Sequence, residues 1–164
     1  MTDQTDTGAA RGRAHWTEGE RQVAVAFAVL SVIGAGLSFL IAVRIGGRDF
    51  FARGAGPYDL WMVLAGATGA ALSLWQVRGR FGHPGLAGLG RALGGMAIIT
   101  LAAPIIGGTL ALPLYGTMFG PFALAVTFAG APFTAVIWVA GLCGVHALFF
   151  THRAERETIF RPRR

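Results

Sequence analysis

The chain has 164 residues, of which 54% are hydrophobic and only 13% are charged, whereas about a quarter of the residues in a soluble globular protein are charged. This composition predicts an integral membrane protein and excludes a disordered chain, and a single cysteine excludes a disulfide-stabilised scaffold and a zinc ribbon. All 14 basic residues are arginine, and they outnumber the 8 acidic residues to give a net charge of +6.

The arginines stand next to long apolar runs rather than in one basic block. A basic chain can bind nucleic acid through its phosphates. Arginines at the ends of apolar runs, however, are typical of membrane proteins, where they set the orientation and contact anionic lipid. We therefore expect membrane lipids as partners, together with other integral membrane subunits or further copies of this chain, and no nucleic acid.

The N-terminal part predicts a tail, a helix cap and a first membrane span. Residues 1–16 are expected to form a disordered cytoplasmic tail. Thr17 and Glu20 have the spacing of a capping box, and no charged residue occurs between Arg21 and Arg44. A bilayer core about 30 Å thick needs about 20 apolar helical residues, so the first span is predicted at 22–43, as an uncleaved anchor.

A second charge-free run predicts a span at 60–77. Asp59 is expected to cap this helix after Pro57. Trp61 and Trp75, at the two ends of the run, match the aromatic belts that membrane proteins have at the level of the lipid headgroups.

The third and fourth spans are predicted within the stretch 92–152, which has 61 residues and no formal charge. As one helix it would be about 90 Å long, three times the thickness of the bilayer core. The segment 113–121 holds two prolines and two glycines, which break helices and favour turns. We therefore predict spans at 93–112 and 122–150, kinked at Pro104 and Pro132, followed by an arginine-rich cytoplasmic tail at 151–164.

Four spans place both termini on the same side of the membrane. Eleven arginines then share the side of the termini and three lie on the other side, and the positive-inside rule assigns the richer side to the cytoplasm. The predicted fold class is an all-α integral membrane protein, a four-transmembrane-helix bundle over residues 17–150 with both termini cytoplasmic. The predicted location is the cell inner membrane, as a multi-pass protein.

Small residues at helical spacing predict sites of close helix packing, because small side chains let helix backbones approach each other in lipid. Such contacts can lie within the chain, or they can form a seam for a partner subunit or a second copy. The residues predicted for this role are Gly34, Ser38, Gly66, Ala70, Gly90, Gly94 and Gly141.

Chemistry that needs an ionisable group inside the membrane lacks its residues here. The predicted spans contain no Asp, Glu, Lys or Arg, which proton-coupled carriers and voltage sensors require. A single cysteine cannot carry out thiol–disulfide exchange, and no predicted span has the paired histidines of an intramembrane metalloprotease. We expect no catalytic residue and no metal site, so the chain is predicted not to be an enzyme.

His146 is the candidate residue for binding a cofactor. It lies in a predicted span close to Gly144 and Ala147, which leave room for a flat macrocycle. A neutral imidazole is a good axial ligand for haem iron or a chlorophyll-type magnesium. The alternative is an interfacial histidine that bonds to a neighbouring group, and the sequence leaves the identity of any cofactor open.

Three functions remain open from the sequence. The first is a non-catalytic accessory or assembly subunit of a larger bacterial membrane protein complex, which accounts for the small size and the small-residue seams. The second is a small homo-oligomeric channel or facilitator for a neutral solute, lined by Thr100 and Thr134. The third is a pigment- or haem-binding membrane subunit that uses His146. Five arginines are expected to contact lipid or a partner: Arg78, Arg80, Arg91, Arg153 and Arg156.

Overall fold

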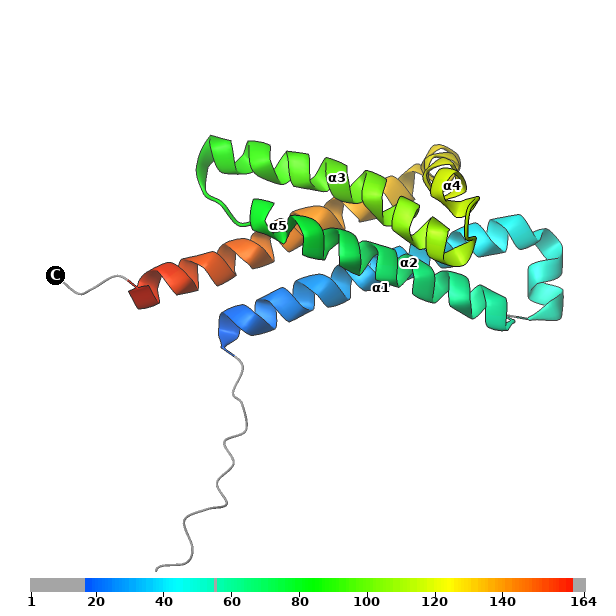
Figure 1. The fold of residues 1–164 in the computed structure, drawn as a ribbon, viewed down its shortest axis with the longest axis horizontal. Coiled ribbons are helices and arrows are strands. Elements are labelled where there is room, and N and C mark those ends of the chain that lie inside the picture. Colours follow the sequence, from blue (N-terminus) through cyan, green and yellow to red (C-terminus); the bar gives the residue numbers. More distant parts are fainter. Residues whose placement is uncertain (1–16, 55, 161–164) are drawn as a thin grey trace, which may run out of the picture.

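The computed structural model describes residues 17–54 and 56–160, so the tail predicted at 1–16 lies outside the described residues. All elements of the described part are helices (Figure 1). Four of them are long and apolar enough to cross a membrane, which confirms the expectation of an all-helical chain with four candidate membrane spans. The elements are α1 (Glu18–Arg53), α2 (Pro57–Val77), the short 3-10 helix η1 (Arg78–Arg80), α3 (Gly85–Ala111), α4 (Gly116–Gly130) and α5 (Pro132–Phe160).

Helix α1 begins at the predicted capping box. The Glu20 N–H donates to Thr17 Oγ1 at 3.2 Å, and the Thr17 N–H donates to Glu20 Oε2 at 3.0 Å, so both partners of the box are satisfied. The apolar part of α1 ends at Ile45. Gly47 follows with a φ of 57°, and the last turns of α1 bend away from the span at this point (Figure 1).

Helix α2 begins three residues before the predicted span, and Asp59 lies inside its first turn. Pro57 is the first helical residue, and the Asp59 carboxylate accepts the Gly56 N–H at 2.8 Å. A carboxylate at this position satisfies a backbone donor that the first turn leaves free and offsets the positive end of the helix dipole.

The predicted boundaries of the fourth span, 122–150, are wrong. The structure has a short apolar helix, α4, and a separate spanning helix that begins at Pro132. Ala131 between them is not helical, with φ −149° and ψ 78°. Pro132 has no N–H to continue the helix before it and is well suited to the first turn of the next one. It therefore separates two helices instead of kinking one, whereas Pro104 does lie inside α3 as predicted.

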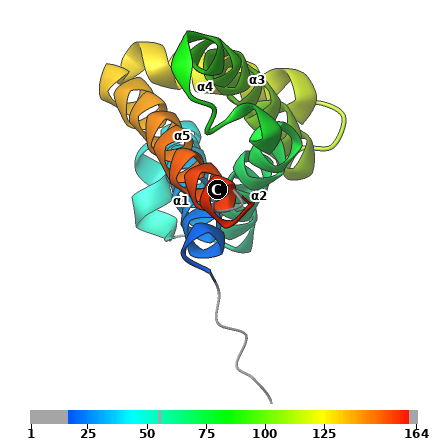
Figure 2. The same cartoon turned by 90° about the vertical axis from the view of Figure 1, so that its left-hand side faces the viewer.

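Helix α4 lies across the bundle. Figures 1 and 2, which are a quarter turn apart, show it running from the end of α3 to the start of α5 at a steep angle to the spanning helices. The predicted hinge at 113–121 is consequently only partly a turn, because its second half forms the beginning of α4.

Helix α5 continues beyond the predicted end of the fourth span to Phe160, so the segment 151–160 of the predicted tail is helical. Residues 151–160 contain Ala, Arg and Glu, which favour helix, and the first proline after Pro132 is Pro162. Residues 161–164 lie outside the described part of the chain.

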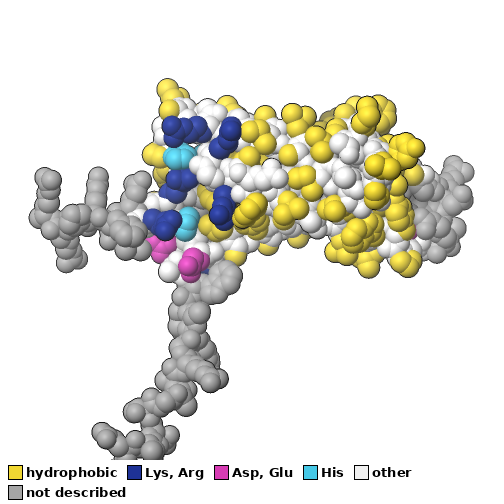
Figure 3. Space-filling view, in the orientation of Figure 1, with side chains coloured by type: hydrophobic (Ala, Val, Ile, Leu, Met, Phe, Trp, Pro, Cys, Tyr) yellow, Lys and Arg dark blue, Asp and Glu magenta, His cyan; other side chains and the backbone are white. Residues whose placement is uncertain are grey.

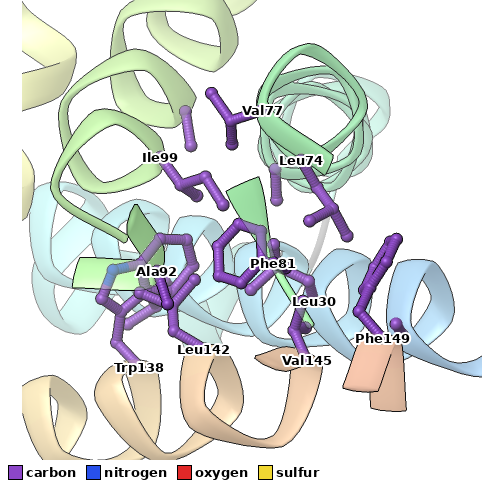
Figure 4. Packing of buried hydrophobic residues seen from close by; sticks show 14 of the residues in the cluster. Leu30, Leu74, Val77, Phe81, Ala92, Ile99, Trp138, Leu142, Val145 and Phe149 are labelled. Carbon is purple, nitrogen blue, oxygen red and sulfur yellow. The ribbon is translucent and has the colours of Figure 1, made fainter. Parts of the chain in front are cut away.

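The helices pack around one apolar core. Helix α1 packs against α2 and α5, and α2 packs against α3. Leu30, Leu74, Ile99 and Leu142 come from four different helices and are fully buried. Phe81, from the turn between α2 and α3, is also fully buried and lies in the middle of this cluster (Figure 4). The turn thus contributes to the core, although its neighbours in sequence are arginines and glycines.

Candidate functional site

Most of the predicted small-residue contacts pack inside the chain. A Cβ atom at Gly34 would lie 2.7 Å from the Cβ of Ala70, and one at Gly66 would lie 2.6 Å from the Cβ of Ser38. These four residues hold α1 directly against α2. A Cβ atom at Gly141 would collide with the Ile33 side chain, which places Gly141 in the contact between α5 and α1. The close packing of helices in lipid is the physical reason for small residues at these sites.

Gly90 and Gly94 differ from that set, because no helix of the described chain covers them. A Cβ atom at Gly90 would meet no atom within 4 Å, and one at Gly94 would meet only Arg80 Nη1, at 3.5 Å. Gly36 on α1 and Gly144 on α5 are likewise exposed with open space around them. The structure therefore divides the glycines into an inward group that the fold explains and an outward group that it does not.

Gly36 borders an apolar groove on the outside of the contact between α1 and α5. This outer α1–α5 groove has a volume of about 320 Å³. Its side chains are apolar except for Thr134, whose hydroxyl donates to the Ala131 carbonyl at 2.7 Å. The lining residues are Ile33, Gly36, Leu37, Phe39, Leu40, Phe133, Thr134 and Ile137.

His146 is bonded within the chain. Its Nδ1 accepts the Gly82 N–H at 3.3 Å, and its ring lies 6.3 Å from that of Phe81. A neutral imidazole that accepts at Nδ1 carries its proton on Nε2, and a protonated nitrogen has no lone pair for a metal. In this arrangement the imidazole fixes the α2–α3 turn to α5. This agrees with the second possibility for His146, a histidine that bonds to a neighbouring group, rather than with a cofactor ligand.

Arg153 fixes the same turn about two helical turns further along α5. Its Nε donates to the Phe81 carbonyl at 2.8 Å and its Nη2 donates to the Gly79 carbonyl at 3.0 Å. This arginine, which was predicted to contact lipid or a partner, therefore uses two of its donors inside the chain. The charge-assisted bonds satisfy carbonyls that the turn leaves free.

The two ends of the described chain meet beside this turn. The Gly19 N–H at the start of α1 donates to Glu155 Oε2 on α5, where the carboxylate lies at the positive end of the α1 dipole. A Cβ atom at Gly19 would collide with both Glu155 and His152. The last turns of α5 are therefore packed on the first turn of α1.

The remaining four predicted arginines, Arg78, Arg80, Arg91 and Arg156, are exposed at this end of the molecule. Figure 3 shows the arginine and histidine side chains gathered at the end that holds the start of α1 and the end of α5. Arg78 lies over the exposed ring of Trp75, 5.8 Å from its centroid. Arg44 stands at the opposite end, beside Gly130.

The hydroxyls proposed to line a channel bond inside the chain. Thr100 Oγ1 donates to the Met96 carbonyl at 2.8 Å and accepts the Trp138 indole N–H at 2.9 Å, and Trp138 is only 3% exposed. Thr134 is fully buried as well. This arrangement is typical of core packing, in which each buried polar group has a local partner.

An apolar cavity of about 80 Å³ lies between α1, α2, α3 and α4, and Trp138 of α5 also lines it. Glycine, alanine and aliphatic side chains form most of its wall, and Ser38 is the hydroxyl residue among them. A cavity with this lining offers space for apolar atoms but no acid, base or nucleophile for a reaction.

Sequence reasoning missed the role of the α2–α3 turn, residues 78–84. Phe81 and Gly82 look like part of a polar loop because they stand between arginines, histidine and proline. The available signal was the pair of a large aromatic residue and a glycine, since a glycine permits the close backbone approach that buries its neighbour.

No protein-family model, no curated protein and no solved structure matches this chain. The function is therefore argued from the residues and their arrangement.

Proposed function

We propose that the chain is a non-catalytic accessory or assembly subunit of a larger protein complex in the cell inner membrane. The observation that carries this proposal is the presence of two outward glycines, Gly36 and Gly144, on the side of α1 and α5 that holds the outer α1–α5 groove. Gly36 borders the groove, and Gly144 lies two turns along α5 from Ile137, on the same exposed side of α5.

Open glycines in a membrane helix need a physical reason. Glycine in a helix interior is less favourable than alanine by about 1 kcal/mol in water, and no contact within the described chain requires a glycine at these two positions. In lipid, small residues are the surface against which another helix packs closely. Ala140 and Ala147, both exposed, extend the small surface of α5 on either side of Gly144. A spanning helix of another subunit fits this groove by shape and by apolar character.

The interior supports a role without chemistry of its own. His146 is bonded to the turn, Thr100 and Trp138 are bonded to each other, and the cavity is apolar. What such a bundle can offer to other molecules is its outer surface. The excess of arginine at one end supports an orientation with that end in the cytoplasm.

The test is gentle extraction of the tagged full chain from its native membrane, followed by native mass spectrometry. The expected result is a particle that contains a second kind of subunit. Gly36→Leu and Gly144→Leu should lose that subunit while the chain itself remains folded. Gly90→Leu is the matched control, since it changes an outward glycine away from the groove and should retain the subunit.

A particle that contains only this chain would contradict the proposal. Retention of the second subunit in the double variant Gly36→Leu, Gly144→Leu would contradict the assignment of the groove as its binding surface.

A further inference from the structure

Arg80, in the turn between α2 and α3, lies along one face of α3. Its Cβ is 3.4 Å from where a Cβ of Gly95 would stand, and its Nη1 is 3.5 Å from the corresponding position of Gly94. The side chain therefore crosses α3 at two consecutive glycines. Larger side chains at these two positions would lift the guanidinium away from the helix.

Arg91 belongs to the same face of α3. It precedes Gly94 by three residues and Gly95 by four, and residues at these spacings are neighbours on a helix surface. Both arginines are exposed. The three glutamates whose side chains the structure describes at this end are used elsewhere, because Glu18 pairs with Arg21, Glu20 is part of the capping box, and Glu155 accepts the Gly19 N–H. Among the described residues, neither Arg80 nor Arg91 has a carboxylate within 4 Å.

The surface next to this pair is apolar. Ile98, which follows Arg91 by seven residues, is partly exposed, and Leu101 and Ile105, which follow Gly94 and Ile98 by seven residues, are 62% and 37% exposed. Trp75, which is also exposed and carries Arg78 over its ring, lies at the end of α2 beside the same turn. Exposed aromatic residues beside arginines are typical of the level of the lipid headgroups.

We propose that Arg80 and Arg91 form a binding site for the phosphate of an anionic phospholipid, whose acyl chains lie along Ile98, Leu101 and Ile105 of α3. Two guanidinium groups offer paired N–H donors that match phosphate oxygens. A basic surface beside apolar helix surface selects a ligand that is anionic at one end and apolar at the other. A free phosphate ion would use the arginines but not these apolar side chains.

The test is native mass spectrometry of the purified full chain in detergent. The protein is titrated with phosphatidylglycerol, with phosphatidylcholine of the same acyl chains, or with inorganic phosphate. We expect phosphatidylglycerol to bind most tightly. Arg80→Gln and Arg91→Gln should each weaken it about fivefold, and the double variant by about 25-fold, from the usual contribution of a basic residue near an anionic lipid surface.

Arg44→Gln is the matched control, because it removes an equal charge from the opposite end and should leave the affinity unchanged. Far-UV circular dichroism and gel filtration check that each variant keeps the fold. The proposal is overturned if the double variant binds phosphatidylglycerol as the unmodified chain does, or if Arg44→Gln weakens binding equally. Binding of phosphatidylcholine or of inorganic phosphate as tight as that of phosphatidylglycerol also overturns it.

Discussion

Gly82 is the residue on which the position of the α2–α3 turn depends, and two separate constraints act on it. Its φ is 77°, a conformation that side chains with a Cβ rarely adopt. A Cβ at this position would also lie 2.5 Å from the backbone carbon and oxygen of Phe149. The close approach brings the Gly82 N–H to His146 and keeps Phe81 in the core.

A series of glycine substitutions separates these constraints. Gly85 has the same φ of 77° but open space around it, and Gly79 is open with an ordinary φ. Gly85→Ala should lower the free energy of unfolding by about 1–2 kcal/mol, and Gly82→Ala should lower it further because the new methyl group collides with the α5 backbone. Gly79→Ala should have almost no effect. Thermal unfolding in detergent, followed by circular dichroism, measures the order. Equal effects at Gly82 and Gly85 would contradict the importance of the α5 contact.

His146→Leu tests the role assigned to the imidazole. The substitution leaves the Gly82 N–H without its acceptor, and a buried donor without a partner costs about 1–3 kcal/mol. We therefore expect a lower unfolding temperature and an unchanged visible absorption spectrum of the purified protein. Cys143→Leu, at an exposed position one turn earlier on α5, should leave both unchanged. An absorption band that His146→Leu abolishes would instead establish the cofactor interpretation.

At the level of the elements, α4 is the part of the fold that hydropathy describes least well. It is apolar along its whole length and has 15 residues, which corresponds to about 22 Å and is too short to cross the bilayer core. Contacts of α4 glycines with α3 hold it across the bundle: Cβ atoms at Gly116 and Gly120 would collide with the backbone at Gly108 and Pro104. The exposed side chains Met118, Phe122 and Val126 cover its outer face.

Spin labels at single cysteines can measure this geometry. In a Cys143→Ser background, labels at positions 118, 122 and 126 of α4 should report nearly the same depth in the membrane. A label at 136 in the same background and a label on the native Cys143 of the unmodified chain, seven residues apart on α5, should differ in depth by about 10 Å. Accessibility to oxygen and to a polar nickel complex gives these depths. A gradient along α4 as steep as that along α5 would favour the continuous span at 122–150.

The elements also show what the sequence can and cannot predict. Charge-free runs locate α1, α2 and α3 because the length of an apolar segment is a physical requirement of the bilayer. The break at Pro132 was misjudged because a proline either kinks a helix or starts one, and the packing of the α4 glycines on α3, which holds α4 across the bundle, is not visible in the sequence. Spacing likewise places Gly66 and Gly90 on helix faces, but it cannot say that α1 covers Gly66 and that nothing in the described chain covers Gly90.

At the scale of the whole molecule, the helix ends that lie together determine where the arginine side chains gather. The start of α1, the α2–α3 turn and the end of α5 lie at one end (Figures 1 and 2) and are connected by bonds of Glu155 and Arg153. Six described arginines belong to this end: Arg21, Arg78, Arg80, Arg91, Arg153 and Arg156. The four candidate spanning helices, with α4 lying across the bundle, bring both described ends of the chain to one end of the molecule. If these four helices cross the membrane, two orientations of the chain are left to distinguish.

The arginine excess predicts which orientation is adopted, since positively charged short segments are retained in the cytoplasm. A fluorescent protein that becomes fluorescent only in the cytoplasm should give a signal when it is fused after residue 164. The same protein should give no signal when it is inserted at Gly54. A periplasmic phosphatase reporter should give the opposite pattern. Replacing Arg78, Arg80 and Arg91 together by glutamine should reduce the cytoplasmic signal, because these three hold the middle turn on that side. Phosphatase activity at the C-terminus of the unmodified chain would establish the reverse orientation and would place the proposed lipid site in the outer leaflet.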